Sequence, residues 1–192
     1  MNADELTPEF AITDELLKQA SQIRLVLFDV DGVLTDGRLF FSDSGDEGKS
    51  FHARDGLGIN LLQQSGVAVG IITARQSRLV EHRARDLNIK HLFQGRKEKF
   101  PAYQELCSDL GLSPAEVAFV GDDVVDLPIM LDVGLAVTVP EGHKLVKQHA
   151  HWTTQNQGGS GAARDVCELI MYSQGTYSKM MEQFLSASAA SA

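Results

Sequence analysis

The chain has 192 residues, of which 43% are hydrophobic, and its formal net charge is -9 at pH 7. This length suits one well-packed domain better than two. The sequence shows no basic patch, which argues against a nucleic-acid binder, and no run of ~18 apolar residues that would cross a membrane. Because an acidic surface repels anions, a phosphorylated ligand would need a local cation or a metal ion.

The start of the chain and the cysteine usage indicate the compartment. Residues 1–10 are acidic and lack the apolar core of a signal peptide. Cys107 and Cys167 lie far apart, each in a helix-like stretch, as is typical of buried thiols in a reducing compartment. We therefore expect a soluble, cytoplasmic protein.

The first elements are a helix, a strand and a hairpin. Apolar residues at helical spacing predict a helix at 12–22, within an N-terminal extension covering residues 1–22. Residues 23–28 form a nearly continuous apolar run, typical of a strand buried on both faces of a parallel sheet. Two strands, 38–42 and 49–53, flank a polar loop and predict a β-hairpin, called here the hairpin (residues 38–53). Its aromatic side chains would be costly to expose, so we expect it to pack on another subunit.

Strands and helices alternate over the rest of the chain. Further strands are predicted at 67–72, 91–93, 117–120 and 135–137. Helices are predicted at 58–64, 76–87, 98–110, 126–132 and 144–149. This alternation indicates an α/β fold, with a doubly wound parallel sheet covered by helices on both faces.

The C-terminal part contains a glycine-rich segment. We interpret residues 158–161 as a flexible lead into a helix at 162–172. Residues 176–192 are expected to be a flexible tail, and its final serine and alanine run, 186–192, to be disordered. The main domain would then cover residues 23–175.

Polar side chains follow three of the predicted strands. Asp29 and Asp31 follow the first strand, Thr73 follows the strand at 67–72, and Asp122 follows the strand at 117–120. The carboxyl ends of parallel strands form the ligand-binding edge of such sheets. Clustered carboxylates repel one another unless a cation lies among them, and Mg²⁺ prefers carboxylate and phosphate oxygens. Asp29 and Asp122 are the natural side-chain ligands of this predicted metal ion.

The same residues can carry out phosphoryl transfer. Asp29 can attack phosphorus to give an aspartyl-phosphate, which divides hydrolysis into two steps. A bound metal ion would shield the nucleophile from the negative phosphate. Asp31 points to the same side of an extended segment and can protonate the leaving alkoxide and then activate water. The sequence therefore predicts a Mg²⁺-dependent phosphatase that acts on a small metabolite.

Four motifs in this order resemble those of the haloacid dehalogenase superfamily of phosphatases. Residues 29–35, Asp-Val-Asp-Gly-Val-Leu-Thr, match the first motif, and Thr73 matches the second. Lys99 matches the third and residues 121–126, Gly-Asp-Asp-Val-Val-Asp, match the fourth. The resemblance implies the Rossmann-like fold of that superfamily.

The resemblance also implies roles for individual residues. Thr73 would bond the phosphoryl group, and Lys99 would hold both the nucleophile and the phosphate. Asp31 would bind the metal through its backbone carbonyl as well. Asp123 and Asp126 would support the metal ligands as neighbouring acidic residues.

A closer resemblance concerns the hairpin, residues 51–56 and residues 158–167. These look like the capless, tetrameric subfamily that hydrolyses 3-deoxy-D-manno-octulosonate 8-phosphate to the free sugar acid and phosphate in lipopolysaccharide biosynthesis. Too few residues lie between Asp31 and Thr73 for a large cap domain beside the hairpin. The resemblance implies a homotetramer in which neighbouring subunits complete each site. The residues that it implies bind the sugar acid phosphate are Asp31, His52, Ala53, Arg54, Asp55, Gly56, Asn60, Arg75, Arg83 and Lys99.

Several of these assignments have alternatives. Arg83 could belong to a solvated helix face, and Lys97 or Arg96 could take the place of Lys99. Asn60 stands where the subfamily often has a basic residue. Asp126 could equally be a helix cap.

The function also has rivals. One is a phosphatase for a nine-carbon sugar acid phosphate, a relative of sialic acid, and another is a non-catalytic regulator on the same fold. A receiver domain accepts phosphate on aspartate too, but it lacks an acid two residues after the nucleophile and lacks the hairpin.

Overall fold

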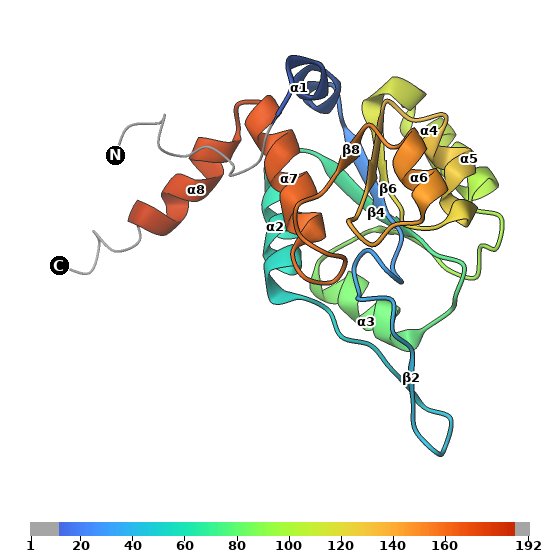
Figure 1. Cartoon of the computed structure of the whole chain (residues 1–192). Coiled ribbons are helices and arrows are strands. Elements are labelled where there is room, and N and C mark those ends of the chain that lie inside the picture. Colours follow the sequence, from blue (N-terminus) through green and yellow to red (C-terminus); the bar gives the residue numbers. More distant parts are fainter. Residues whose placement is uncertain (1–11, 187–192) are drawn as a thin grey trace.

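The computed structural model describes residues 12–186. Six parallel strands form one sheet in the order β5-β4-β1-β6-β7-β8. Figure 1 shows this sheet between two layers of helices, with the hairpin extending below it. The predicted doubly wound parallel sheet is confirmed.

The sheet strands are short and buried. They are β1 (Leu25–Phe28), β4 (Ala68–Ile72), β5 (His91–Phe93), β6 (Val117–Val120), β7 (Leu135–Thr138) and β8 (Trp152–Thr153). All but β8 were predicted. β8 is only two residues long, and no periodic pattern can be read from so short a run.

The helices cover both faces of the sheet. They are α1 (Asp14–Ser21), α2 (Ala53–Gln64), α3 (Arg78–Asp86), α4 (Phe100–Leu110), α5 (Leu127–Met130), α6 (Lys144–His149), α7 (Ala162–Ser173) and α8 (Tyr177–Ser186). Two 3₁₀ turns, η2 (Pro114–Glu116) and η3 (Val124–Asp126), precede β6 and α5.

Alternate residues of the central strand serve two hydrophobic cores. Val26 and Phe28 of β1 belong to the core formed with α1, α2, α3 and α7. Leu25 and Leu27 belong to the core formed with α4, α5 and α6. Burial on both faces explains why β1 is apolar at every position. The chain then leaves the core at the carboxyl edge of the sheet, where Asp29 follows β1.

The helix α2 begins five residues earlier than predicted, at Ala53 rather than at residue 58. Ala53 was predicted to end the second hairpin strand, and Gly56 and Gly58 are poor helix formers. In the structure, Gly58 lies against α7, where an added Cβ would be 2.8 Å from Cδ of Arg164. Close packing against α7 therefore outweighs the low helix propensity of this stretch.

The hairpin is confirmed, but its second strand was misplaced. β2 (Phe40–Phe41) pairs antiparallel with β3 (Glu47–Gly48), not with residues 49–53. The turn is tighter than expected because the Ser42 amide donates to the Asp46 carbonyl at 2.9 Å and Gly45 takes a positive φ of 86°. Phe40 and Phe41 remain 54% and 60% exposed.

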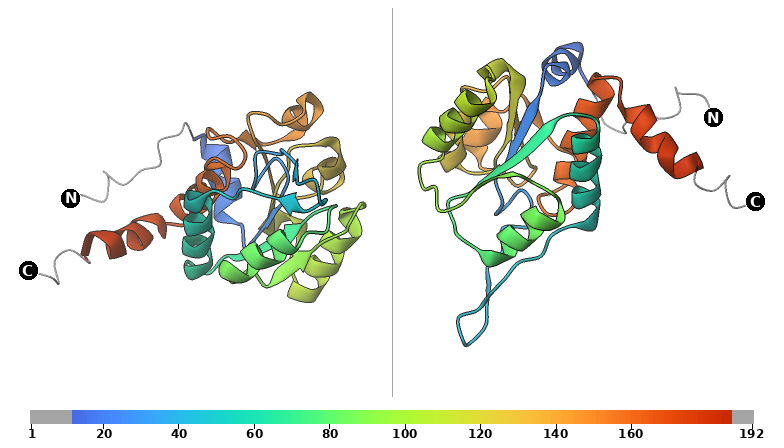
Figure 2. Two further views of the ribbon diagram at one scale, coloured as in Figure 1. Left: turned by 90° about the horizontal axis from the view of Figure 1, so that it is seen from below. Right: turned by 180° about the vertical axis from the view of Figure 1, so that it is seen from behind.

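The helix α8 was not predicted, because it lies in the segment that was expected to be a flexible tail. Tyr177, Met180 and Met181 pack against the core from this helix. Figure 2 shows α8 projecting from the body of the molecule near α2 and α7. The disorder expected at the end of the chain, and the extension before residue 12, lie outside the described residues.

Candidate active site

The loop after β1 delivers the first two carboxylates. Asp29 is buried, and its amide donates to the Val120 carbonyl of β6 at 3.0 Å. Gly32 has a positive φ of 94°, and an added Cβ would lie 2.1 Å from Oδ2 of Asp122. Only glycine therefore permits the turn that brings this loop against the end of β6.

Three carboxylates converge at the carboxyl edge of the sheet. One oxygen from each of Asp29, Asp122 and Asp126 lies within 4.8 Å of the other two. Burial raises the pKa of Asp29 from 3.8 to about 6, although Lys99 opposes the shift. Burial and the charges of Asp29 and Asp126 raise the pKa of Asp122 to about 7. The cluster thus carries more negative charge than its surroundings balance, which is the situation that a bound cation relieves.

Lys99 is the cation of this cluster. Its buried ammonium lies 2.8 Å from Oδ1 of Asp29 and 2.6 Å from Oδ1 of Asp126. Burial alone would lower the pKa of Lys99, but these two carboxylates more than offset burial and raise it. Lys99 therefore stays charged beside Asp29, whereas its rival Lys97 is exposed.

Asp126 lies at the centre of the cluster and also caps a turn. Its Oδ2 accepts from the amides of Asp122 at 3.1 Å and Asp123 at 3.2 Å, while its Oδ1 meets Lys99. The Asp126 side chain thus completes a capping box at the start of η3 and makes no cap bond to α5, so it is not the cap of that helix. Its support of the metal ligands stays a prediction. Asp123 is exposed, and its carboxylate accepts from the Val124 amide at 2.8 Å.

The donor set fits Mg²⁺. Asp29, Asp122 and Asp126 offer only oxygen atoms, which a hard cation requires, and the site is open enough for Asp122 to be partly exposed. The Asp31 side chain is not part of this group, and its expected metal contact is through its backbone carbonyl. Asp29 and Asp122 would hold the metal ion directly, and Asp126 fixes both the loop and Lys99.

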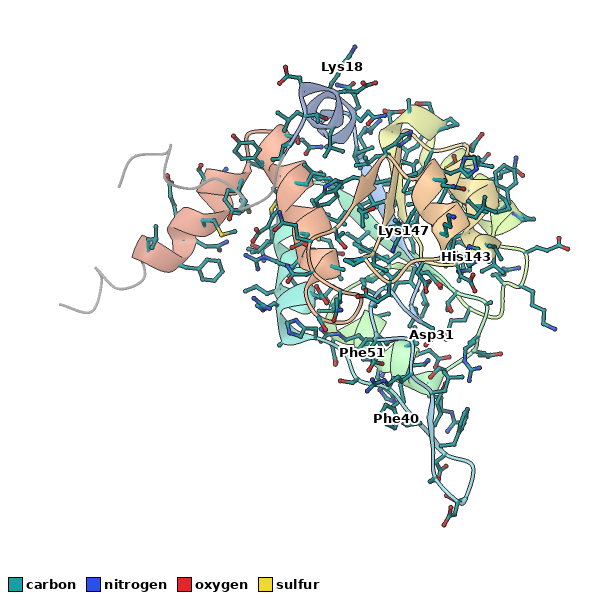
Figure 3. The ribbon with its side chains drawn as sticks, in the orientation of Figure 1. Lys18, Asp31, Phe40, Phe51, His143 and Lys147 are labelled. Carbon is teal, nitrogen blue, oxygen red and sulfur yellow. The ribbon has the colours of Figure 1, made fainter. Side chains whose placement is uncertain are left out.

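The Asp31 side chain turns instead toward the hairpin (Figure 3). Its Oδ1 pairs with Nζ of Lys49, and its Oδ2 lies 3.7 Å from Nε of Arg75. Glu47 links the two cations, at 3.4 Å from Nζ of Lys49 and 3.0 Å from a terminal nitrogen of Arg75. Glu47 and Lys49 were not predicted as site residues, because only the packing of the hairpin brings them to Asp31 and Arg75.

Thr73 directly follows β4, the neighbour of β1. It is buried, its amide donates to the Phe93 carbonyl of β5 at 2.9 Å, and its hydroxyl accepts from the Arg75 amide at 3.4 Å. These bonds fix the turn after β4, so that Thr73 and Arg75 lie at the same edge of the sheet as Asp29.

His52 is the N-cap of α2 and residues 53–56 are its first turn. These residues divide into two groups. Ala53 and Arg54 are exposed, so both side chains are available to a ligand or to another subunit. Asp55 is 2% exposed and accepts from the amides of Gly161 at 3.3 Å and Arg164 at 2.9 Å. In the described chain, Asp55 therefore caps α7 and tethers α2 to it.

Arg83 holds this segment against α3. Its guanidinium donates to the His52 carbonyl at 3.0 Å and lies 5.7 Å from the centroid of the Phe51 ring. Gly56 leaves room for it, since an added Cβ there would lie 2.4 Å from the Arg83 guanidinium. The structure thus gives Arg83 a packing role and does not leave it on a solvated helix face.

Asn60 lies away from the carboxylates. It lines a cavity of about 620 Å³ together with residues at the amino ends of β4 and β5, including Val67 and His91. A contact between Asn60 and substrate stays a prediction, and it would require the substrate of a neighbouring subunit.

The glycine-rich segment at 158–161 is packed, so its interpretation as a flexible lead is wrong. The Gly159 amide donates to the Val33 carbonyl at 2.9 Å. An added Cβ at Gly158 would lie 1.8 Å from the Gly32 carbonyl oxygen. The segment therefore supports the loop that carries Asp31. Gly158 and Gly159 have no side chain, which lets the two backbones lie in contact.

Within residues 12–186, none of the helices combines the length and the apolar character that a membrane span requires.

Comparison with known proteins gives one family match within the chain. Residues 91–164 match the family described as haloacid dehalogenase-like hydrolase. This stretch contains Lys99, Asp122 and Asp126.

Relatives of known name cover most of the chain. The 3-deoxy-D-manno-octulosonate 8-phosphate phosphatase of Yersinia pestis is 45% identical over 85% of this chain and 87% of the relative. The enzyme of the same name from Escherichia coli strain K12 is 43% identical over 85% of this chain and 87% of the relative.

A solved structure with ligands is also similar. The phosphatase of the same name from Moraxella catarrhalis, in complex with magnesium ion, phosphate ion and a KDO molecule, has a TM-score of 0.88 and 37% identity. The alignment covers 90% of this chain and 99% of that one.

Proposed function

We propose a function for this chain on the premise that it belongs to the 3-deoxy-D-manno-octulosonate 8-phosphate phosphatase family of haloacid dehalogenase-like hydrolases. The chain is a Mg²⁺-dependent phosphatase that hydrolyses this sugar acid phosphate to the free sugar acid and phosphate, a step in lipopolysaccharide biosynthesis. The observation that carries the proposal is the buried contact of Lys99 with Asp29 inside a group of three carboxylates.

Asp29 is the nucleophile. Its carboxylate attacks phosphorus, the bond from phosphorus to the sugar oxygen breaks, and an aspartyl-phosphate forms on Asp29. Lys99 keeps Asp29 in place and offers positive charge to the phosphoryl oxygens. The Thr73 hydroxyl donates a hydrogen bond to the same group. Bound Mg²⁺ supplies further positive charge that balances the nucleophile and the transferred phosphate.

Asp31 moves the proton in both steps. It gives a proton to the leaving sugar oxygen, and then takes one from the water that attacks the aspartyl-phosphate and releases phosphate. Its side chain lies on the hairpin side of the site, where the leaving group has room outside the carboxylate cluster.

Recognition of the sugar acid falls to the residues around this rim. Arg75 has a side chain that is 42% exposed and a guanidinium suited to a carboxylate. His52, Ala53, Arg54 and Gly56 lie at the start of α2, and Asp55 and Arg83 hold that segment in position. Asn60 is kept as a candidate contact to a neighbouring subunit's substrate.

The assembly is a homotetramer in which hairpins from different subunits meet. Support comes from Phe40 and Phe41, which are too exposed for a single chain in water. The compartment is the cytoplasm, supported by Cys107 and Cys167, which are both free and buried.

A panel of sugar phosphates tests this function. The purified chain is assayed with Mg²⁺ against the eight-carbon sugar acid phosphate, a nine-carbon sugar acid phosphate and neutral sugar phosphates. We expect the eight-carbon acid to have the highest kcat/KM and chelation of Mg²⁺ to abolish turnover. Equal rates on neutral sugar phosphates would refute the substrate, and turnover in excess chelator would refute the metal requirement.

A further inference from the structure

Lys49 is a buried cation at the base of the hairpin that the motifs of the sequence do not include. Its side chain is 1% exposed, although it comes directly after the short strand β3. Its ammonium pairs with Oδ1 of Asp31 and lies 3.4 Å from Oε1 of Glu47. A buried ammonium is stable only when paired, so this contact constrains both partners.

The site therefore has two lysines with separate partners. Lys99 contacts Asp29 and Asp126 on the sheet side, and Lys49 contacts Asp31 on the hairpin side. Asp31 and Asp29 are two residues apart in sequence, yet their carboxylates are held by cations from different parts of the chain. The orientation of Asp31 thus depends on the hairpin and not on the sheet alone.

Glu47 keeps Lys49 in place independently of Asp31. Its carboxylate contacts both Lys49 and Arg75, so the two cations have a second acceptor next to Asp31. When the Asp31 carboxylate takes up a proton and loses its charge, Lys49 still has Glu47 as a carboxylate partner. A direct role in binding the substrate is less favoured for Lys49, because Arg75 is 42% exposed and Lys49 only 1%.

We propose that Lys49 is a positioning residue, which holds the Asp31 carboxyl group where the leaving oxygen of the substrate arrives. This inference rests on the proposed function, in which Asp31 protonates that oxygen. Lys49 acts through Asp31, so its loss should weaken the step that needs a proton donor more than the attack by Asp29.

The test compares a poor and a good leaving group. The sugar acid phosphate leaves as an alkoxide that needs a proton, whereas p-nitrophenyl phosphate leaves as a stable phenolate that needs little help. For Lys49→Met, we expect kcat/KM for the sugar acid phosphate to fall ~10–100-fold, less than the ~100–10,000-fold that general acid catalysis contributes, because Asp31 itself is kept. We expect kcat/KM for p-nitrophenyl phosphate to change far less and Lys49→Arg to recover part of the loss.

The matched control is Lys18→Met, an exposed lysine on α1 at the opposite end of the molecule (Figure 3). It should leave both substrates unaffected. An equal loss on both substrates in Lys49→Met would overturn the inference in favour of a structural role. A rise in KM for the sugar acid phosphate with unchanged kcat would overturn it in favour of substrate binding. Failure of the wild-type chain to hydrolyse any phosphate ester would instead refute the proposed function, and the inference with it.

Discussion

Lys99 lies between two carboxylates and is the residue on which the charge balance of the site depends. Replacing it by Met removes the cation that contacts Asp29 at 2.8 Å and Asp126 at 2.6 Å. Because preorganised charge is worth ~100–1,000-fold in rate, we predict a loss of that size in kcat for Lys99→Met. Steady-state kinetics with saturating Mg²⁺ measures it.

The control for this prediction is Lys97→Met. Lys97 is exposed and only two residues away, and it was a rival assignment in the sequence. A comparable loss in Lys97→Met, or full activity in Lys99→Met, would contradict the assignment.

The raised pKa values of the carboxylates predict how Mg²⁺ stabilises the fold. Without metal, the pKa of Asp29 is raised to about 6 and that of Asp122 to about 7, both by burial first. Groups with raised folded pKa values favour the folded state at low pH, and this stability is lost as pH rises from about 4 through about 7. Mg²⁺ competes with the protons, so its stabilising effect must grow over the same range.

Thermal unfolding with Mg²⁺ and with chelator at about pH 5 and about pH 8 tests this linkage. We expect the increase in Tm on adding Mg²⁺ to be larger at the higher pH. Comparing the two conditions at each pH cancels the titration of other groups. An equal or larger gain at the lower pH would show that these carboxylates do not bind the ion.

At the scale of elements, the glycine-rich segment before α7 supports the loop after β1. Gly158→Ala would place a Cβ 1.8 Å from the Gly32 carbonyl oxygen, and backbone on both sides leaves no room to move. We predict a loss of at least ~1–3 kcal/mol in the free energy of unfolding, the usual cost of overpacking, together with reduced activity. Urea denaturation measures the first and steady-state kinetics the second.

Gly48→Ala is the matched substitution for comparison. An added Cβ there would meet only Cβ of Phe40 at 3.4 Å, an ordinary contact. Equal stability of the two variants would mean that the segment does not brace the loop.

The elements also show how far the sequence can be followed. The strands β1, β4 and β6 were predictable because burial on both faces makes them apolar throughout, and their ends located Asp29, Thr73 and Asp122. Lys49 and the role of Asp55 were not predictable. Their partners, Asp31 and the amides of α7, are distant in sequence, and only the packing of the hairpin and of α2 on α7 brings them together.

At the scale of the whole molecule, the hairpin exposes large apolar side chains that its own chain does not cover. Phe40 and Phe41 are 54% and 60% exposed on a two-stranded ribbon, which is marginally stable in water. We predict that the double variant Phe40→Ser, Phe41→Ser has a smaller assembly mass than the tetramer proposed for the wild-type chain. Light scattering coupled to size exclusion measures the mass.

Phe184→Ser provides the control, since Phe184 is 52% exposed on α8, far from the hairpin (Figures 1 and 2). It should leave the mass unchanged. A wild-type chain of monomer mass, or a double variant that still has the full mass, would contradict hairpin-mediated assembly.

The central claim is that Asp29 becomes phosphorylated during turnover, and trapping that intermediate tests it most directly. The chain is mixed with substrate carrying radiolabelled phosphate and Mg²⁺, quenched in acid within the first turnover, digested and mapped. The account predicts an acid-stable label that is released by hydroxylamine and located on the peptide containing Asp29, and none in Asp29→Asn. A label on another residue, or Asp29→Asn turning over at the wild-type rate, would contradict it.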